Sequence, residues 1–314
     1  MKIYFTFDPR PDLKEDLLHE FPEQEFIFRN TVDEDLLKTA EILVTYGEDL
    51  VEEHIAIANQ LQWIMVVSAG LEKMPLNEIA KRGIVVSNVR GIHKVPMAES
   101  VLAHILAYKR SLPWIYEKER NAEWNRKSKS KELRDSTALI LGPGAIGGEI
   151  GRLLQCFGVK TIGCNRSGMN ADYMDCMVKF DDLTTVLPDA DIVISVLPST
   201  KETHHLLGPE HFKAMKTSAI FMNFGRGDLV ATDVLQQALL QNDIAYAICD
   251  VFEEEPLPKE HPFWTMDNIT VSPHVSSHSS RYLERGFDIF KPNLKKWIAG
   301  DKQIENIIDP SKGY

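Results

Sequence analysis

Three glycines in the middle of the chain, Gly142, Gly144 and Gly147, constrain the fold more than any other feature. They follow the apolar run at residues 137–141 with G-x-G-x-x-G spacing, and an apolar-periodic segment comes next. A dinucleotide-binding βαβ unit needs this order of strand, turn and helix. The first glycine allows a tight turn, the second lets a pyrophosphate approach the backbone, and the third lets the helix pack on the strand. We therefore expect a cofactor to contact Gly142, Gly144, Ala145, Ile146 and Gly147.

Short apolar runs alternate with amphipathic segments on both sides of this loop. Such alternation indicates parallel βαβ units, hence open sheets with helices on both faces. The first part predicts strands at residues 2–7, 25–29, 42–46, 63–67 and 84–87, with helices at 12–20, 33–39, 51–60 and 75–81. The second predicts further strands at 159–163, 191–196, 218–223, 245–251 and 269–272, with helices at 209–215 and 231–241. The pattern predicts an α/β protein with two flavodoxin/Rossmann-like domains and parallel sheets.

Two long helices are expected beside the glycine-loop series. Residues 96–118 predict one continuous helix, and residues 277–299 predict another that ends at Gly300. With these helices as connections, residues 99–274 form a cofactor domain inserted into a discontinuous substrate domain of residues 1–98 and 275–314. The cleft between the two domains is then the expected active site.

Composition excludes several classes of protein. The formal net charge of -11 argues against nucleic-acid binding, because only scattered lysines and arginines offset repulsion from phosphates. No apolar run approaches the length of a membrane span, and the chain begins with a strand-like segment instead of a signal peptide, so we expect a cytoplasmic protein without membrane contacts. No histidine, aspartate or glutamate set has metal-ligand spacing, so no catalytic metal is expected. Reduced, buried thiols are expected at Cys156, Cys164, Cys176 and Cys249.

Polar residues follow the later strands where each strand ends. They include Arg226 between two glycines, an acidic segment from Asp250 to Glu255, and His274 after a proline. Ligands of open α/β sheets bind at that edge. Hydride transfer to a carbonyl suits this set, because arginine can hold a substrate carboxylate and histidine can hand over a proton. A carboxylate beside the histidine orients the imidazole and favours its protonated form.

Together with the glycine loop, these segments resemble the D-isomer-specific 2-hydroxyacid dehydrogenase family over nearly the whole chain. Residues 223–230 match the family's Asn-x-x-Arg-Gly-x-Leu-Val pattern, which makes Arg226 the counterpart of the catalytic arginine. The family's Asp-Val-Phe, followed by Glu-Pro, is matched from Asp250, which makes Glu255 the carboxylate of a Glu/His pair. The Pro-His signature makes His274 the acid/base.

The resemblance implies further roles. Residues 67–71 look like the loop whose backbone N–H groups receive the substrate carboxylate, a role assigned to Ala69 and Gly70. Pro198 resembles the cofactor-facing turn, and Asp250 is expected near the nicotinamide, where it can orient the carboxamide. The residues after the catalytic histidine and the ending at 306–314 are most similar to the glyoxylate/hydroxypyruvate reductase branch, type A. Family resemblance, together with the apolar long helix, implies a homodimer.

The strand after the glycine loop bears on the choice of cofactor. NAD-specific folds place an acidic residue about 20 positions after the loop, where it binds the ribose hydroxyls. Here Asn165 stands in that place, and Arg166 with Ser167 can pair with a 2′-phosphate. This favours NADP(H), and a neutral loop that accepts NAD(H) is the alternative.

The sequence therefore predicts an NADPH-preferring reductase of small 2-oxo acids, of glyoxylate or hydroxypyruvate type, that forms D-2-hydroxy acids. The rival from another class is a nucleotide-sensing corepressor resembling C-terminal binding proteins, although those carry extra disordered tails and this chain stops at Tyr314. Within the enzymes, an NAD-dependent dehydrogenase of other substrate range is the alternative. Candidates for shaping the substrate pocket are Tyr46, Ser68, Leu71 and residues 114–124. His278 is a further candidate on the substrate side.

Overall fold

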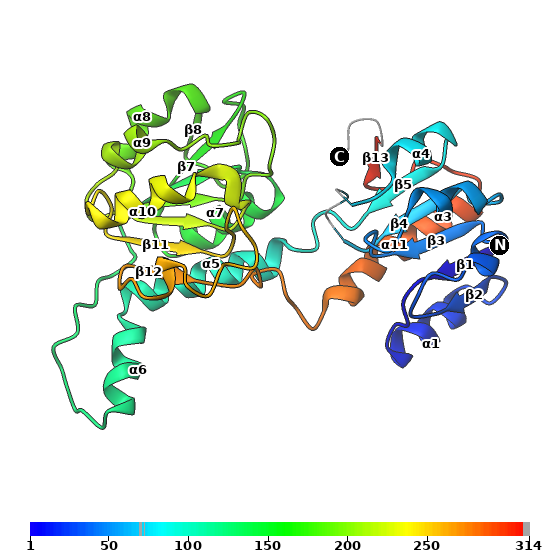
Figure 1. Cartoon of the computed structure of the whole chain (residues 1–314), viewed down its shortest axis with the longest axis horizontal. Helices are drawn as coiled ribbons and strands as arrows, with labels where there is room; N and C mark the ends of the chain where they lie inside the picture. Colours follow the sequence, from blue (N-terminus) through cyan, green and yellow to red (C-terminus); the bar gives the residue numbers. More distant parts are fainter. Residues whose placement is uncertain (69–70, 72, 310–314) are drawn as a thin grey trace. The chain divides into compact units, whose positions relative to one another are not determined.

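The computed structural model describes residues 1–68, 71 and 73–309, and it divides into two compact units (Figure 1). Unit 1 comprises Met1–Ile92 and the segment from Ser279 onward, and unit 2 comprises His93–His278. The borders expected from the sequence, after residues 98 and 274, lie a few residues from these. Both units alternate strands and helices, and the predicted α/β class is confirmed.

Unit 1 contains one six-stranded sheet in the order β13-β5-β4-β3-β1-β2. All its pairings are parallel except that of β13 with β5. The strands are β1 (Lys2–Phe5), β2 (Glu25–Phe28), β3 (Ile42–Thr45), β4 (Trp63–Val66), β5 (Val85–Asn88) and β13 (Ile307–Ile308). The helices are α1 (Pro11–Glu20), α2 (Glu34–Leu37), α3 (Glu52–Ile57), α4 (Leu76–Lys81) and α11 (Tyr282–Ile298).

Helices cover both faces of this sheet, because its central strands are apolar on both sides. On one face, Phe287 and Phe290 of α11 pack with Phe5 and Trp63, joined by leucines of α1. On the other face, side chains of α2, α3 and α4 pack on Leu43 and its neighbours. The C-terminal helix α11 thereby covers one face of a sheet that is built mainly from N-terminal strands.

Unit 2 contains a seven-stranded, wholly parallel sheet in the order β12-β11-β10-β9-β6-β7-β8. The chain runs outward from β6 in one direction and then returns to β9 and continues in the other, so the switch point lies between β6 and β9. The strands are β6 (Thr137–Leu141), β7 (Lys160–Asn165), β8 (Cys176–Lys179), β9 (Ile192–Ser195), β10 (Ile220–Asn223), β11 (Tyr246–Cys249) and β12 (Ile269–Val271). The helices are α5 (Lys94–Lys109), α6 (Leu112–Arg120), α7 (Ala145–Cys156), α8 (Leu183–Val186), α9 (Pro209–Ala214), α10 (Thr232–Leu240) and the short 3-10 turns η1 (Phe180–Asp182), η2 (Leu187–Asp189), η3 (Gly227–Leu229) and η4 (Pro262–Trp264).

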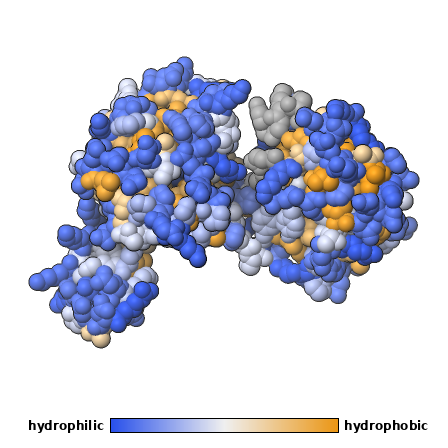
Figure 2. Space-filling model, in the orientation of Figure 1, coloured by the Kyte–Doolittle hydropathy of each residue, from blue (hydrophilic) through white to orange (hydrophobic). Residues whose placement is uncertain are grey.

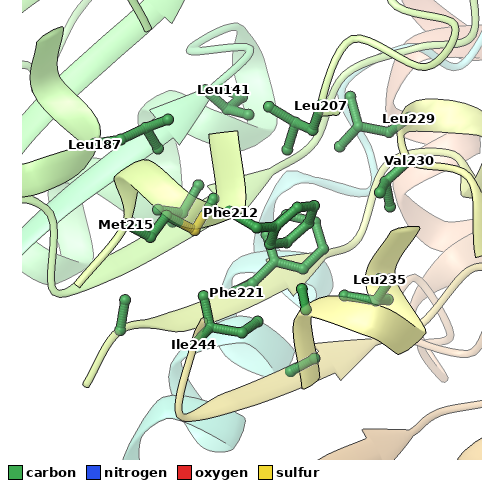
Figure 3. Close-up of a cluster of buried hydrophobic side chains, with 14 of the residues drawn as sticks. Leu141, Leu187, Leu207, Phe212, Met215, Phe221, Leu229, Val230, Leu235 and Ile244 are labelled. Atoms are coloured by element: carbon green, nitrogen blue, oxygen red, sulfur yellow. The ribbon is translucent and has the colours of Figure 1, made fainter. Parts of the chain in front are cut away.

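Two apolar clusters hold this unit together, one on each face of the sheet. Side chains of α5 and α7 pack on one face. On the other face, Phe212 of α9 meets Phe221 of β10 edge to face at 5.3 Å between ring centroids, within the cluster shown in Figure 3. Outside these clusters, hydrophilic residues cover most of the visible surface (Figure 2).

The prediction of one helix over residues 96–118 is wrong. The structure has two helices, α5 and α6, which are separated at Arg110 and Ser111. Ser111 adopts a left-handed conformation with φ 55°, and Pro113 lies in the first turn of α6. A proline at that place lacks the N–H that a continuous helix would use and clashes with the preceding turn, so the helix restarts there.

Other expectations differ in detail. Helix α11 begins at Tyr282, later than predicted, and strands β8 and β13 are not among the predicted strands. Both strands are short and lie at sheet edges, where pairing depends on neighbours more than on local pattern.

The prediction that all four cysteines are buried is wrong for Cys156 and Cys176, which are exposed. Among the described residues, no helix is both long and apolar enough to cross a membrane.

Candidate active site

The glycine loop lies at the carboxyl end of β6, at the switch point of the unit 2 sheet. Gly142 has φ 88°, a conformation that only glycine adopts readily, and its N–H donates to Cys164 O of β7 at 2.9 Å. A Cβ on Gly147 would overlap the carbonyl oxygen of Gly142, so α7 packs tightly against the turn. A Cβ on Gly144 would meet nothing within 4 Å. The loop therefore has the close packing and the open approach that a pyrophosphate site needs, and Ala145 and Ile146 begin α7 beside that opening.

The loop after β9 lies against this turn. A Cβ built on Gly142 would touch the Leu197 side chain at 3.1 Å, and one built on Gly225 would overlap the Leu197 backbone. Pro198 follows, and its carbonyl accepts a hydrogen bond from Thr203 Oγ1 at 2.6 Å. Leu197 thus links the glycine loop to the turn that carries Arg226, on the two sides of the switch point.

Asn165, Arg166 and Ser167 lie at the end of β7, next to the glycine loop. The Asn165 Oδ1 accepts hydrogen bonds from the Ser167 backbone N–H at 3.1 Å and from Gly168 N–H at 2.6 Å, so Asn165 orders the turn. The Arg166 side chain is 80% exposed, and its Nη1 lies 3.9 Å from Oε1 of Glu202. The guanidinium is therefore open to an anionic ligand, but a carboxylate lies beside it.

The turn that carries Arg226 follows β10 and is ordered by its neighbours. Asn223 is buried, its Oδ1 accepts from Gly225 N–H at 3.2 Å, and its Nδ2 donates to Arg226 O at 2.9 Å. A Cβ on Gly227 would overlap the peptide that joins Phe252 to the next residue. Glycine on the far side of the arginine is therefore required for the turn to pack on the loop after β11.

Glu255 and His274 form a direct pair. The Nδ1 of His274 lies 2.8 Å from Oε2 of Glu255, and Oε1 of Glu255 accepts the Phe252 N–H at 3.0 Å. A carboxylate accepts only, so Nδ1 carries the proton and Nε2 is left for a ligand. Both side chains are partly exposed, at 48% for the histidine and 36% for the glutamate. His274 has φ 54°, and its N–H donates to Asp250 O at 2.9 Å.

Asp250 is buried and holds the segment that carries His274. Its carboxylate accepts hydrogen bonds from Ser272 Oγ, from Val275 N–H at 3.0 Å and from Ser276 N–H at 3.1 Å. These contacts fix the loop on both sides of the histidine. The expected contact of Asp250 with a nicotinamide stays a prediction.

A cavity of about 450 Å³ opens beside the Glu255–His274 pair. Its lining combines these two polar groups with apolar side chains from the loops after β11 and β12, including Phe252, Leu257 and Trp264. Nearby, His104 of α5 lies 5.8 Å from the Phe224 ring. Burial lowers the pKa of His104, and the negative charge of Asp250 opposes this only in part.

Unit 2 thus brings the Arg226 turn, Asp250, Glu255 and His274 together, and separately joins the glycine loop to residues 165–167. Ala69 and Gly70, expected to receive the substrate carboxylate, lie outside the described residues, as do residues 310–314 of the chain ending. Beside the described part of that loop, Ser68 Oγ donates to Tyr46 O at 3.0 Å and Tyr282 Oη donates to Val67 O at 2.6 Å.

Sequence reasoning missed several residues around the site. Glu202 lies in a polar turn with no motif, and Ser272 and Ser276 are recognisable only once Asp250 is known to be buried. Glu253 was one of three adjacent acidic residues, which gave no reason to separate it from its neighbours. In the described part of the chain, no group of three histidine, cysteine or carboxylate side chains could hold a metal ion.

Comparisons with known proteins show the family of this chain. The family model described as "D-isomer specific 2-hydroxyacid dehydrogenase, NAD binding domain" matches residues 102–276. A glyoxylate reductase of Thermofilum pendens is 31% identical and covers 96% of this chain and 92% of its own. A glyoxylate/hydroxypyruvate reductase B of Pectobacterium carotovorum is 30% identical and covers 95% of both chains. A crystal structure of a D-isomer specific 2-hydroxyacid dehydrogenase family protein from Aeromonas salmonicida is 31% identical, superposes with a TM-score of 0.86, and covers 98% of this chain and 99% of its own.

Proposed function

Because this chain belongs to the D-isomer-specific 2-hydroxyacid dehydrogenase family, we propose that it reduces small 2-oxo acids of the glyoxylate or hydroxypyruvate type, with a preference for NADPH. The family makes it an NAD(P)-dependent oxidoreductase, and relatives at about this identity are reductases of 2-oxo acids. The product would be the D-2-hydroxy acid.

The observation that carries the proposal is the Glu255–His274 pair beside a cavity, in the same unit as the glycine loop. Nδ1 of His274 is engaged by the carboxylate, so Nε2 is the atom that would protonate the substrate oxygen. Glu255 would keep the imidazole oriented and stabilise its protonated form. The chemistry supplied by a bound nicotinamide is donation of a hydride to the carbonyl carbon.

Arg226 would hold the substrate carboxylate. Its guanidinium is planar with parallel N–H donors, which suits bidentate binding of a carboxylate and polarises the adjacent carbonyl. The turn that carries it is packed against the Glu255 loop through Gly227. Ala69 and Gly70 would supply backbone N–H groups to the same carboxylate, and residues 1–98 and 275–314 would form the substrate domain.

The preference for NADPH is proposed from the end of β7. Arg166 is exposed and could pair with a 2′-phosphate, and Ser167 offers a hydroxyl. Glu202 works against this preference, since a carboxylate near Arg166 would repel the phosphate. NAD(H) remains the alternative cofactor, and Glu202 is the residue that favours it.

A homodimer is proposed from helix α6 and the segment after it. No residue of α6 is buried, although the helix carries Ile115 and Tyr116 with large exposed areas. Trp124, shortly after the helix, is 95% exposed. Exposed aromatic and aliphatic side chains grouped in one segment are typical of a protein interface. Light scattering of the wild type and of Trp124→Ala tests this, and the substitution should weaken association.

Steady-state kinetics test the proposed reaction. The purified protein is assayed for oxidation of NADPH and of NADH with glyoxylate, hydroxypyruvate, pyruvate and 3-phosphohydroxypyruvate. The proposal expects the highest kcat/KM with NADPH and one of the first two acids. Efficient turnover only with NADH, or only with the phosphorylated acid, would place the chain elsewhere in the family.

A further inference from the structure

A second glutamate–histidine pair lies close to the proposed catalytic pair. Nε2 of His205 lies 2.8 Å from Oε1 of Glu253. The other oxygen, Oε2, accepts hydrogen bonds from the Thr232 backbone N–H at 2.5 Å and from Thr232 Oγ1 at 2.6 Å. Each oxygen of the Glu253 carboxylate thus binds a different segment of the chain, one at Thr232 and the other at His205.

The first of these segments leads directly from the Arg226 turn. Thr232 is the first residue of α10, so the Glu253 carboxylate binds the N-terminus of that helix, where the backbone dipole favours a negative charge. Partial burial acts to raise the pKa of Glu253, but hydrogen bonds from Thr232 and His205 outweigh it and leave the pKa below its usual value. The group is therefore a carboxylate at neutral pH.

The second segment is the loop after β9, which carries His205. The His205 N–H donates to Asp228 O at 2.7 Å, and the Leu207 N–H donates to Leu229 O at 3.2 Å. Ser199 Oγ adds a hydrogen bond to the Asp228 carboxylate at 2.6 Å. This loop is thereby joined to η3, the turn that directly follows Arg226.

Glu253 also lies within the loop that carries the proposed catalytic carboxylate. The peptide between Phe252 and Glu253 is the one against which Gly227 packs. The N–H of Phe252, at the other end of that residue, donates to Oε1 of Glu255. A shift of the peptide would therefore move both the Arg226 turn and the carboxylate that orients His274.

We propose that Glu253, held by His205 and Thr232, is a positioning residue that fixes this peptide and so sets Arg226 and Glu255 in place for the reaction. The expected effect of Glu253 on catalysis rests on the proposed function. Its effect on the position of the Phe252–Glu253 peptide is a property of the fold alone. Glu253 acts through its neighbours and need not touch substrate or cofactor. Its side chain is turned toward Thr232 and His205, whereas Glu255 is turned toward His274.

Matched variants test this role. Glu253→Ala removes the carboxylate, Glu253→Gln keeps an oxygen that can accept from Thr232, and His205→Ala removes one partner. Glu254→Gln is the control, because it changes the same charge at the adjacent exposed residue. The kcat and KM values for the oxo acid and for NADPH are measured for each variant and for the double variant Glu253→Ala/His205→Ala.

The proposal expects Glu253→Ala to lower kcat/KM for the oxo acid by about tenfold to a hundredfold, as small displacements of reacting groups do. The KM for NADPH should stay within about twofold, and Glu253→Gln should recover part of the loss. The double variant should be no worse than Glu253→Ala, because His205 acts through Glu253. Additive losses, or a Glu253→Ala enzyme equal to the Glu254→Gln control, would overturn the proposal.

Hydrogen exchange separates failure of this inference from failure of the proposed function. Backbone amides in residues 224–232 and 250–256 should exchange faster in Glu253→Ala and Glu253→Gln than in the wild type, with no change in Glu254→Gln. If the wild type reduces no 2-oxo acid, the proposed function is wrong. The exchange rates still show whether Glu253 holds residues 224–232 and 250–256 in place. Unchanged exchange in both Glu253 variants overturns the inference.

Discussion

Glu255 holds His274 with one carboxylate oxygen and the chain's own backbone with the other. Oε2 lies 2.8 Å from the imidazole Nδ1, while Oε1 accepts the Phe252 N–H at 3.0 Å. The glutamate is therefore held by the chain's own backbone, and the imidazole is oriented by a group that cannot easily turn away. This arrangement suits a histidine that must deliver a proton from Nε2.

Glu255→Gln tests that relationship. The amide can still accept the Phe252 N–H, but the charge that stabilises the imidazolium is lost. We expect kcat for reduction to fall about tenfold to a hundredfold, the cost of a hydrogen bond to a charged group, with KM for NADPH unchanged. Steady-state kinetics from about pH 5 to about pH 9, an interval that spans the usual histidine pKa, measure the change in kcat. An unchanged kcat would separate Glu255 from the chemistry.

Arg226→Lys tests carboxylate binding. Lysine keeps the charge but loses the parallel N–H donors, so KM for the oxo acid should rise at least about tenfold. Cofactor affinity should not change, and titration of NADPH fluorescence supplies that control. Equal KM values for the wild type and the lysine variant would place the substrate carboxylate elsewhere.

Two glycines of the same loop should respond differently to alanine. A Cβ on Gly147 overlaps Gly142 O, so Gly147→Ala should destabilise the fold by about 1–3 kcal/mol. Nothing lies within 4 Å of a Cβ on Gly144, so Gly144→Ala should leave thermal stability unchanged and weaken NADPH binding. Calorimetry and cofactor titration distinguish the two effects. Tight cofactor binding by Gly144→Ala would contradict the placement of the pyrophosphate.

Cofactor choice should depend on the contact between Arg166 and Glu202. Arg166→Ala should raise KM for NADPH about tenfold and leave KM for NADH nearly unchanged, because only the 2′-phosphate is lost as a partner. Glu202→Gln should shift the preference toward NADPH. Equal effects on both cofactors would remove these residues from the phosphate site.

His104 should titrate at lower pH than an exposed histidine, because burial lowers its pKa from the usual 6.5. A folded-state pKa below the unfolded value means that the unfolded chain binds more protons in that interval. The free energy of unfolding should therefore fall as pH drops below about 6.5, and His104→Leu should remove that part of the dependence. NMR titration of the His104 imidazole gives the direct reading. A His104 that titrates above pH 6.5 would contradict the burial argument.

Much of the fold could be predicted from the sequence because its strongest signals are local. The strand, turn and helix around Gly142 are specified by adjacent residues, and apolar runs marked most strands of both sheets. The sequence pattern does not predict the break between α5 and α6 at Ser111, because apolar residues recur at helical spacing on both sides of it. Pro113 is the local signal for the break, but a proline is also compatible with the first turn of a helix. Edge strands β8 and β13 were missed because their pairing depends on neighbouring strands.

The candidate site could be predicted from the sequence at residues that belong to a motif of their own. Arg226, Glu255 and His274 follow strand ends in a recognisable order. Their supports were not predictable, since Glu253 and Glu202 gain significance only from partners far away in the sequence. Nothing local distinguishes the glutamate that binds His205 from the one that binds His274.

Turnover by His274→Ala tests the central claim most directly. The variant is assayed with NADPH and glyoxylate beside the wild type and His19→Ala, which changes an exposed histidine of α1, while NADPH binding is checked separately. Loss of the proton donor should lower kcat by about 10²- to 10⁴-fold with cofactor affinity retained, and His19→Ala should stay close to the wild type. Wild-type turnover by His274→Ala would show that this histidine is not the acid.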